Sequence, residues 1–516
     1  MPTQRIPLFG SYQNRNQNPT LFTATAPDQQ FINCYPDVTK NALSGRGSVT
    51  LNKRPGWGSV GVISSVTGQY GACIWYGNSA VISPVCASFY KGGSSVIQVY
   101  DVYSTASQIG GDIANAKACL SLSEAIISGT ANLLAIVADD AGSFPLEAWY
   151  FPEGGAWTQI TDADFPPNLG TPEPLTGAPV QLDGFTFFMT KNGKIWNSDV
   201  NSLSAWTASS YTTAQSYPDR GVGLARYKNL IAAFSTGSIE FFQNAGFSPS
   251  PIQPVGNANR RIGAFAGYDF SNTTSPRSIF EYGDTVYFIG VETETARKGI
   301  YRLNGFAPEK ISISAIDRVL NLGSVAHRIV GSFQAHGMSH IVIGQLSGPY
   351  YCYCVDNGWW WLMQTASLGG SLGPTAILGG GLTGGDKNSF MVQGNDGRHH
   401  TLAPSSPVYQ DNSNAMTQTI ITEKVDHGTT ERKFIKRVRP VCDVQSSAST
   451  LSLSYSDDDY GTYSTAVSID ISSQAAIDFG WSRLGSYRGG RAYKLTHASN
   501  TANRMMAIDI EYEIAA

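Results

Sequence analysis

A strand–turn–strand unit recurs along this chain at a spacing that limits the folds it can adopt. The clearest copy lies within Phe280–Leu322, where the apolar runs Thr285–Val291 and Gly299–Leu303 flank a charged turn. Measured from the apolar residue after each turn, the copies are 52, 46, 44, 61 and 51 residues apart, at Ile97, Trp149, Ile195, Ile239, Ile300 and Tyr351. Blades of a β-propeller recur at about 40–50 residues, so the spacing predicts an all-β, propeller-like body of six or seven irregular blades.

Two shorter hairpins belong to the same series. Phe185–Thr190 and Ile195–Asn197 flank an Asn192-Gly193 pair, which predicts a tight type I′ turn with two positive φ angles. Leu230–Phe234 and Ser238–Gln243 flank a Ser-Thr-Gly turn in the same way. Both hairpins predict antiparallel pairing between neighbouring strands.

Three further sequence features bear on the propeller prediction. The longest gap in the series contains polar inserts at Ser271–Pro276 and Glu292–Arg297. No Gly-His…Trp-Asp signature accompanies the repeats, so two stacked sheets stay open as an alternative architecture. Ser314 and Asp317 form a capping-box-like start to one short helix, with the Ser314 hydroxyl expected to accept from the Asp317 amide.

The charge of the chain argues against a DNA-binding surface. The sequence has 35 Lys+Arg against 39 Asp+Glu, a formal net charge of -4, and only 14% charged residues, where about 25% is usual. A protein that binds DNA without sequence preference needs a basic footprint. The 54 Gly, 25 Tyr and 23 Phe favour strands and turns instead.

The N-terminus and the cysteines indicate a protein made in a cytosol. The opening residues have no apolar core of the length that a signal peptide needs, and no segment approaches the roughly 18 apolar residues of a membrane helix. We therefore expect neither export through the usual signals nor membrane insertion. Seven dispersed cysteines are an odd number, and we interpret them as reduced thiols.

Changes in pattern divide the chain into three parts. Residues 1–57 alternate polar tracts with isolated aromatics, which predicts an extended N-terminal arm laid on another surface. Residues 58–410 carry the repeats and form the propeller-like body. Residues 416–516 hold six short alternating runs and predict a separate β-sandwich-like domain, with strands over Gln418–Val425, Phe434–Val444, Leu451–Ser456, Ala466–Ile471, Tyr487–Ala498 and Met505–Tyr512.

Cysteine and histidine pairs do not complete a metal site. Cys352 and Cys354 are expected on one face of a strand, but no second pair at zinc-ligand spacing accompanies them. For His336 and His340, and for the pair His399-His400, ordinary burial is favoured over a ligand role. We expect no metal and no other cofactor.

The run Ser456–Tyr463 is a near miss for a calcium loop and for the Asp-box turn of sialidases. A plain hairpin turn, in which Asp side chains accept from local amides, is favoured.

Scattered acidic residues could pair in a glycosidase site, but the sequence alone does not place any two of them at the required separation: Asp183, Asp199, Glu240 and Glu281. No nucleophile elbow or phosphate loop is present, so the chain is not expected to be an enzyme.

Three groups of residues are candidates for assembly. A basic cluster near the C-terminus fits either a solvated strand or contact with an acidic partner, and it consists of Arg437, Arg439, Arg483, Arg488 and Arg491. A tryptophan run is expected to place one ring in the core and a neighbour at a subunit contact: Trp359, Trp360 and Trp361. The stretch Ala366–Lys387 predicts a long loop or weakly held strands, with candidate channel or gate glycines Gly369, Gly370, Gly379, Gly380, Gly381, Gly384 and Gly385.

Several stretches, in order, resemble the packaged-DNA stabilisation proteins of short-tailed bacteriophages, which are also called tail accessory factors or tail nozzle proteins. These are the opening MPTQRIPLFGSYQNRN with FINCYPD, the hairpin STGSIEFF from Ser235, RIGAFAG from Arg261, IYRLNG from Ile300, and the closing GWSRLG from Gly480 with RAYKL from Arg491. The likeness is strongest over Gly223–Leu322 and Gly480–Tyr512.

The resemblance implies a non-enzymatic virion protein, assembled in the cytoplasm of a host bacterium. Six copies are expected to form a nozzle ring below the portal and its adaptor. This ring would continue the DNA channel, retain the packaged genome, and dock tailspikes, fibres or a tail needle. Double-stranded DNA would pass through without sequence-specific binding, which suits a weakly acidic wall.

An alternative function stays open at this stage. Abundant aromatics and the near-Asp-box also fit a β-propeller that binds or cleaves carbohydrate. Release of reducing ends from a host polysaccharide would distinguish this activity from a purely structural role.

Overall fold

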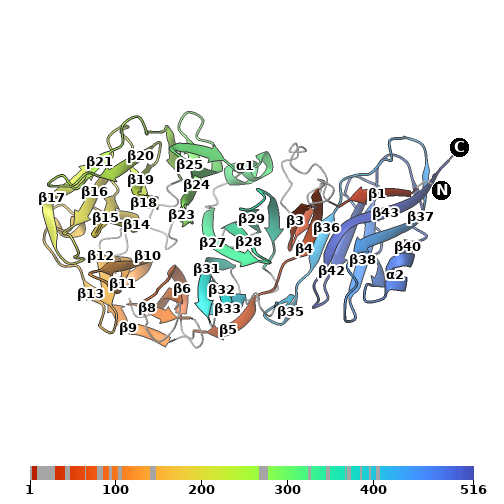
Figure 1. Ribbon diagram of the computed structural model, residues 1–516, viewed down its shortest axis with the longest axis horizontal. Coiled ribbons are helices and arrows are strands. Elements are labelled where there is room, and N and C mark those ends of the chain that lie inside the picture. The colour runs from red at the N-terminus through yellow and green to blue at the C-terminus, as the bar shows by residue number, and fades with distance from the viewer. Residues whose placement is uncertain are drawn as a thin grey trace.

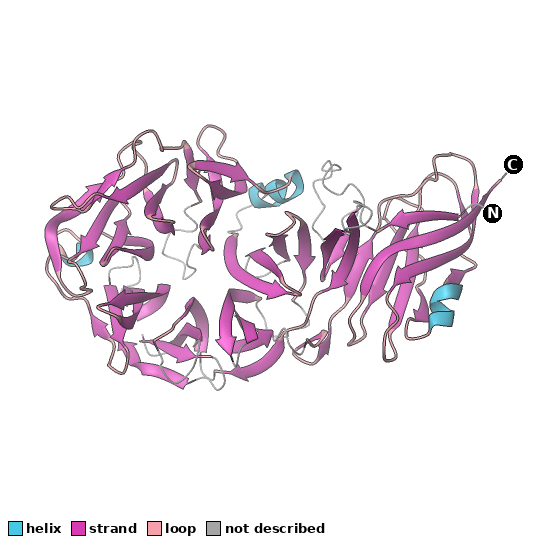
Figure 2. Ribbon diagram, viewed as in Figure 1, coloured by secondary structure: helices cyan, strands magenta, loops and turns pink. Residues whose placement is uncertain are grey.

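The computed structural model of the chain describes residues 3–8, 30–40, 47–63, 66–77, 85–91, 96–102, 107–114, 116–139, 147–265, 277–322, 327–344, 349–365, 368, 373–383, 386–393, 397–402 and 407–515. Strands arranged in a ring lie beside a second group of strands that holds both chain termini (Figure 1). The helical elements of these residues are short, namely η1 (Pro166–Asn168), α1 (Ser314–Asn321) and α2 (Gln474–Phe479) (Figure 2). The predicted all-β fold is confirmed.

The ring consists of antiparallel blades whose strands mostly follow one another in sequence. Blade 1 contains β6 (Val66–Ile74), β7 (Val85–Lys91), β8 (Val96–Asp101) and β9 (Ser107–Ala114). Blade 2 contains β10 (Ala116–Ile127), β11 (Thr130–Asp139), β12 (Glu147–Pro152) and β13 (Thr158–Gln159). Blade 3 contains β14 (Leu175–Leu182), β15 (Phe185–Thr190), β16 (Lys194–Ser198) and β17 (Trp206–Thr213).

Blades 4 to 6 continue the series and complete most of the ring. Blade 4 contains β18 (Gly221–Tyr227), β19 (Leu230–Ser235), β20 (Ile239–Asn244) and β21 (Ile252–Pro254). Blade 5 contains β22 (Ile262–Ala264), β23 (Ile279–Tyr282), β24 (Thr285–Glu292), β25 (Lys298–Asn304) and β26 (Ala307–Lys310). Blade 6 contains β27 (Arg328–Ala335), β28 (Met338–Gly344), β29 (Tyr350–Cys354) and β30 (Trp360–Met363). In blade 5, β22 and β23 both pair with β24.

The seventh blade is closed by a strand from the other end of the ring. It contains β31 (Pro374–Thr383), β32 (Asp386–Gln393) and β33 (Arg398–Leu402), and β33 pairs with β5 (Gly58–Val62). Strand β5 precedes blade 1, and β31 packs against β6 of blade 1. Ring closure in this form joins the first and last blades by sheet pairing and removes an open sheet edge.

The six sequence anchors lie in equivalent strands. Ile97, Trp149, Ile195, Ile239, Ile300 and Tyr351 occupy β8, β12, β16, β20, β25 and β29, which are the third strands of blades 1 to 6 when blade 5 is counted from β23. The sequence spacing therefore marks one blade per repeat, and the propeller interpretation is confirmed over two stacked sheets for this part of the chain.

Two local predictions are wrong in detail. The hairpin β15–β16 is present, but only Gly193 of the Asn192-Gly193 pair has a positive φ, of 85°, and its N–H donates to the Thr190 carbonyl at 2.9 Å. A three-residue loop therefore replaces the type I′ turn. Helix α1 is capped at Ile313, so Ser314 is already inside the helix, and the Ser312 hydroxyl bonds the Asp317 carboxylate.

The second group of strands forms two facing sheets. One contains β3 (Cys34–Lys40), β4 (Gly47–Lys53), β43 (Arg504–Ile514), β37 (Lys433–Cys442) and β40 (Trp481–Ser482), with β1 (Thr3–Pro7) on β43 and β41 (Ser486–Tyr487) on β37. The other contains β39 (Val467–Asp470), β38 (Thr450–Ser456), β42 (Ala492–His497), β36 (Gln418–Ile421) and β2 (Gln30–Ile32). Each of the six runs expected after residue 416 contains one of these strands.

The described part of the N-terminal segment is built into this sandwich. Strand β1 pairs with β43 over Thr3–Pro7, and β4 pairs with the start of β43 through Leu51 and Asn52. Strand β2 pairs with β36. Residues expected to form an arm laid on a surface are thus sheet strands, because their apolar side chains fill the space between the two sheets.

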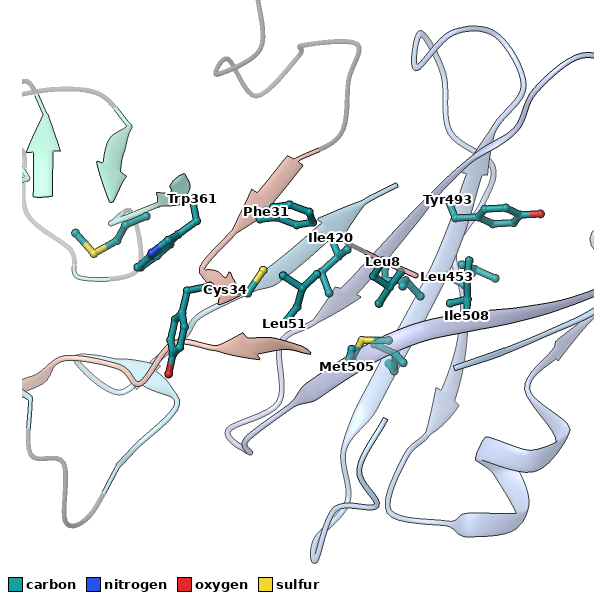
Figure 3. Packing of buried hydrophobic residues seen from close by; sticks show 14 of the residues in the cluster. Leu8, Phe31, Cys34, Leu51, Trp361, Ile420, Leu453, Tyr493, Met505 and Ile508 are labelled. Atoms are coloured by element: carbon teal, nitrogen blue, oxygen red, sulfur yellow. The ribbon is translucent and has the colours of Figure 1, made fainter. Parts of the chain in front are cut away.

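Propeller and sandwich share one sheet and one core. Strand β2 also pairs in parallel with β30, the outermost strand of blade 6, at Ile32 and Leu362. Buried residues continue across this junction from Trp361 to Tyr493, as Figure 3 shows, with Phe31 and Leu51 of the N-terminal segment between them. The hairpin β34 (Gln410–Asp411) and β35 (Asn414–Ala415) lies in the connection. This continuity is expected to hold the two parts in a fixed orientation.

Candidate assembly surface and central cavity

A buried ion pair fastens the junction. Arg54 Nη1 and Nη2 donate to Asp411 Oδ1 and Oδ2 at 2.9 and 2.5 Å, and both side chains are 0% exposed. Arg54 Nε donates to Asn33 Oδ1 at 3.0 Å, and the Trp57 amide donates to Asp411 Oδ1 at 3.1 Å. Arg54 also donates to the Gln364 carbonyl of the segment after blade 6. Buried charges are tolerated when paired and hydrogen-bonded in this way, so four separate segments meet at one ionic contact.

The histidines predicted to be structural lie in the core or beside it. His336 has a φ of 47° and lies with Gly337 in the turn between β27 and β28. Its ring nitrogens contact the hydroxyls of Tyr35 and Tyr409. His340 is fully buried and accepts from Trp361 Nε1 at 3.3 Å, and burial lowers its pKa to about 3.

The other residues considered as metal ligands in the sequence are also buried. His399 and His400 are buried in β33, and burial lowers the pKa of His400 to about 4. Cys352 and Cys354 are buried free thiols in β29, whose pKa burial raises. Within the described ranges, no three His, Cys, Asp or Glu side chains gather as metal ligands.

The sandwich carries a ladder of paired charges on one sheet. Arg5 binds Asp509 with two contacts of 2.8 and 3.0 Å, and these hydrogen bonds lower the pKa of Asp509. Arg439 and Arg437 both approach Glu511, at 3.3 and 3.8 Å, so the two arginines share a face of β37. The carboxylate of Glu511 partly neutralises the charges of Arg437 and Arg439, so these two arginines are weaker candidates for contact with an acidic partner.

Two other arginines of the basic cluster are exposed. Arg483 has a φ of 59° and Arg488 follows β41, and among the described residues neither has an ion-pair partner. Exposed apolar side chains on the same domain include Phe479 and Phe434, at 58% and 41% exposure. The guanidinium of Arg437 lies 5.5 Å from the Phe479 ring. Of the five predicted contact arginines, Arg483 and Arg488 are the ones whose charge is available to a partner.

Arg491 is a core residue, contrary to its prediction as a contact. It is 1% exposed, and its Nε and Nη2 donate to Asp457 at 2.6 and 2.7 Å. The guanidinium also lies 3.8 Å from the Tyr455 ring and 4.4 Å from the Tyr487 ring. Its planar shape suits bidentate pairing and stacking together, and these contacts hold β42 against neighbouring segments.

The tryptophan run is likewise mainly structural. Trp360 is 3% exposed and donates from Nε1 to the Ile311 carbonyl at 3.0 Å. Trp361 is 1% exposed and contacts His340. Strand β30 is paired on both edges, by β29 and β2, and both its faces are covered. Trp360 and Trp361 are therefore not subunit contacts, whereas Trp359 is only partly buried.

The glycine-rich stretch is partly a strand. Gly379, Gly380 and Gly381 belong to β31, which pairs with β32 on one side and contacts β27 on the other. The other candidate gate glycines lie outside the described residues: Gly369, Gly370, Gly384 and Gly385. The part that is described is a blade strand rather than a loop.

The acidic run forms the plain hairpin turn that was favoured. Asp458 accepts from the Thr462 amide at 2.8 Å and from its hydroxyl at 2.6 Å, and it also accepts from Ser456. These bonds lower the pKa of Asp458 to about 2. Asp457 and Asp459 instead pair with Arg491 and Lys424. The turn lies in the sandwich, so it is not a propeller Asp-box.

The scattered acids act as local acceptors. Asp183 accepts from Asn244, and Asp199 from Thr207. Glu240 accepts from the Ser216 amide, and Glu281 from the Arg226 amide at 2.6 Å. Each of these bonds fixes a loop or links neighbouring blades.

A cavity of about 490 Å³ occupies the centre of the propeller. The innermost strands of the seven blades line it, and its wall includes Glu124, Gln181, Arg226, Arg277 and Glu281. Glu124 and Gln181 accept backbone N–H bonds from the preceding blade at 2.8 and 2.7 Å. Burial raises the pKa of Glu124 and of Glu281. Sequence reasoning did not identify this site, because seven separate blades contribute its wall and no local motif links them.

Comparison with known families identifies one match. Residues 167–344, which run from before β14 to the end of β28, match the family model described as bacteriophage P22 Gp10, beta-propeller. This match supports a structural protein of a phage tail and a place in the virion. A search of curated proteins finds no match.

Solved structures show distant likeness only. The WD40 domain of Toxoplasma gondii coronin is 10% identical, covering 72% of this chain and 86% of that chain, with a TM-score of 0.39. The computationally designed Ika8 protein and Saccharomyces cerevisiae Sqt1 are each 9% identical, covering 67% of this chain and 99% of those chains, with TM-scores of 0.35 and 0.37. None of the helices in the described part of the chain is long and apolar enough to span a membrane.

Proposed function

We propose that this protein is the nozzle of a short phage tail. Six copies form a ring below the portal and its adaptor, continue the DNA channel, retain the packaged genome, and dock tailspikes, fibres or a tail needle. The observation that carries this proposal is the family match over residues 167–344. The protein acts mechanically, without chemistry of its own, and it assembles in the cytoplasm of the host.

The architecture suits a load-bearing subunit. Strand β2 joins blade 6 to the sandwich sheet, and the Arg54–Asp411 pair ties the same junction. A subunit without a hinge between its parts transmits force from one contact to the next. A closed ring of such subunits has cyclic symmetry, so every copy contacts its two neighbours through the same pair of surfaces.

The overall charge suits passage of DNA. A net charge of -4 with 14% charged residues leaves few cations to hold phosphate groups. Because DNA affinity comes mainly from Lys and Arg contacts to phosphate, a wall poor in these residues lets the duplex slide.

Removing the protein tests the proposal. Particles assembled without it are expected to lose packaged DNA and to fail to take up later tail components, because the channel below the portal has no closure. DNA content per particle and the protein composition of purified particles measure the two effects. Supplying the wild-type protein in trans is the control and should restore both. Full, stable particles that complete their tails without this chain contradict the proposal.

Charge reversal tests the exposed arginines. We propose that Arg483 and Arg488 contact an acidic surface of a neighbouring virion protein. The double variant Arg483→Glu/Arg488→Glu is expected to unfold within about 0.5 kcal/mol of the wild type, as surface substitutions usually do, while its incorporation into particles falls. Arg220→Glu, at an exposed position of the propeller, is the matched control. Normal incorporation of the double variant would exclude this contact.

A further inference from the structure

The propeller cavity contains an arginine without a counter-charge. Arg277 immediately precedes β23 of blade 5 and lines the cavity. Burial lowers the pKa of Arg277, and the thiols of Cys119 and Cys73, from blades 2 and 1, oppose this effect. Among the described residues, no carboxylate forms an ion pair with Arg277. Arg277 therefore lines the cavity without an ion-pair partner among the described residues.

A second guanidinium lies close to the first. Arg328 begins β27 of the next blade; burial lowers its pKa, Tyr350 opposes this effect, and the nearby charge of Arg277 adds a smaller lowering. Arg328 Nη2 donates to the Pro374 carbonyl at 3.3 Å, whereas its buried Nε has no partner in the described part of the protein.

The carboxylates of the cavity do not offset these charges. Glu124 accepts the Tyr76 amide, and Glu281 accepts the Arg226 amide. Neither carboxylate is among the groups that shift the pKa of Arg277 or Arg328. The hydroxyl of Ser123, a further lining residue, is buried with no partner among the described groups. The wall thus offers the free hydroxyl of Ser123 and a guanidinium, that of Arg277, which forms no ion pair with a described carboxylate.

We propose that this cavity binds a small molecule that carries a phosphate or carboxylate group, with Arg277 holding the anionic group. A volume of about 490 Å³ falls in the range of small-molecule sites. Guanidinium groups recognise phosphate and carboxylate through paired N–H bonds, and a bound anion offsets the cost of burying an unpaired charge. The site is independent of the assembly contacts proposed above.

Anion binding to the full-length protein tests this site. Inorganic phosphate and citrate are the probes, each titrated up to about 10 mM at constant ionic strength with chloride, while the thermal midpoint and calorimetric heat are followed. We expect saturable stabilisation of the wild type by at least one probe, and at least about tenfold weaker binding by Arg277→Gln. A response to phosphate alone assigns the site to phosphorylated ligands, and a response to citrate alone assigns it to carboxylates.

Two further variants keep the result interpretable. Arg5→Gln, at a 66% exposed position of the sandwich, should bind the probe as the wild type does. Arg277→Lys keeps the charge and loses the forked geometry, so it should bind more weakly than wild type, and it replaces Arg277→Gln if that variant does not fold. The proposal is overturned if the wild type binds neither probe, or if the Arg277 variants bind as tightly as Arg5→Gln.

Discussion

Replacing Asp411 with alanine is expected to destabilise the protein by about 3–5 kcal/mol, because it leaves the Arg54 guanidinium buried without its partner. Both side chains are 0% exposed, and the remaining acceptors of Arg54 are an amide oxygen and two backbone carbonyls. A typical domain is stable by only about 5–15 kcal/mol. Chemical denaturation followed by tryptophan fluorescence measures the loss.

A surface ion pair of the same type is the control. Arg5 and Asp509 also form a two-contact pair, but Arg5 is 66% exposed. Exposed pairs contribute about 0–1 kcal/mol, so Asp509→Ala should be nearly neutral. The double variant Arg54→Met/Asp411→Leu removes both charges and should recover part of the loss. Equal effects of Asp411→Ala and Asp509→Ala contradict the importance assigned to the buried pair.

The propeller could be predicted because its blades are local. Each of blades 1 to 6 is formed by strands that are adjacent in sequence, so the turn between β24 and β25, for example, is visible as a charged interval between two apolar runs. Antiparallel neighbours joined by short turns leave this regular pattern in the sequence. The repeat therefore predicted the equivalent strand in six blades.

The seventh blade was missed as a repeat for a physical reason. Its strand β31 is rich in glycine, and its outermost strand β5 comes from before blade 1. The pairing of Arg398 with Val62 joins residues more than 300 positions apart. Local pattern does not encode such pairing, which depends on the closing of the ring.

Contacts between distant segments also explain why some candidate assembly residues were placed wrongly from the sequence. One tryptophan of Trp359–Trp361 was expected in the core and a neighbour at a subunit contact, because the sequence does not reveal that β2 covers the outer edge of blade 6. Arg491 was expected at a surface, because its partner Asp457 lies on a different hairpin. Arg277, by contrast, stands out only after the ring brings it opposite Cys73 and Cys119.

The N-terminal segment gives the second large effect, because its strands are integral to the sandwich. Ile6, Leu8, Phe31 and Leu51 are all buried in the shared core. Each apolar side chain of this size contributes about 1.5–3 kcal/mol when buried. Deleting residues 1–53, which retains Arg54 and β5, therefore removes on the order of 6–12 kcal/mol from those four side chains alone. The sandwich is expected to unfold.

Limited proteolysis with mass spectrometry distinguishes the two parts of the molecule. In the 1–53 deletion, the propeller keeps β5 on β33, so cleavage should begin after residue 410 and spare the blades. Deleting residues 1–63 also removes β5, leaves the edge of β33 open, and should expose blade 7 to cleavage as well. A 1–53 deletion that unfolds cooperatively at the wild-type midpoint would contradict this prediction, because it would show that the N-terminal strands are not needed for the stability of the sandwich.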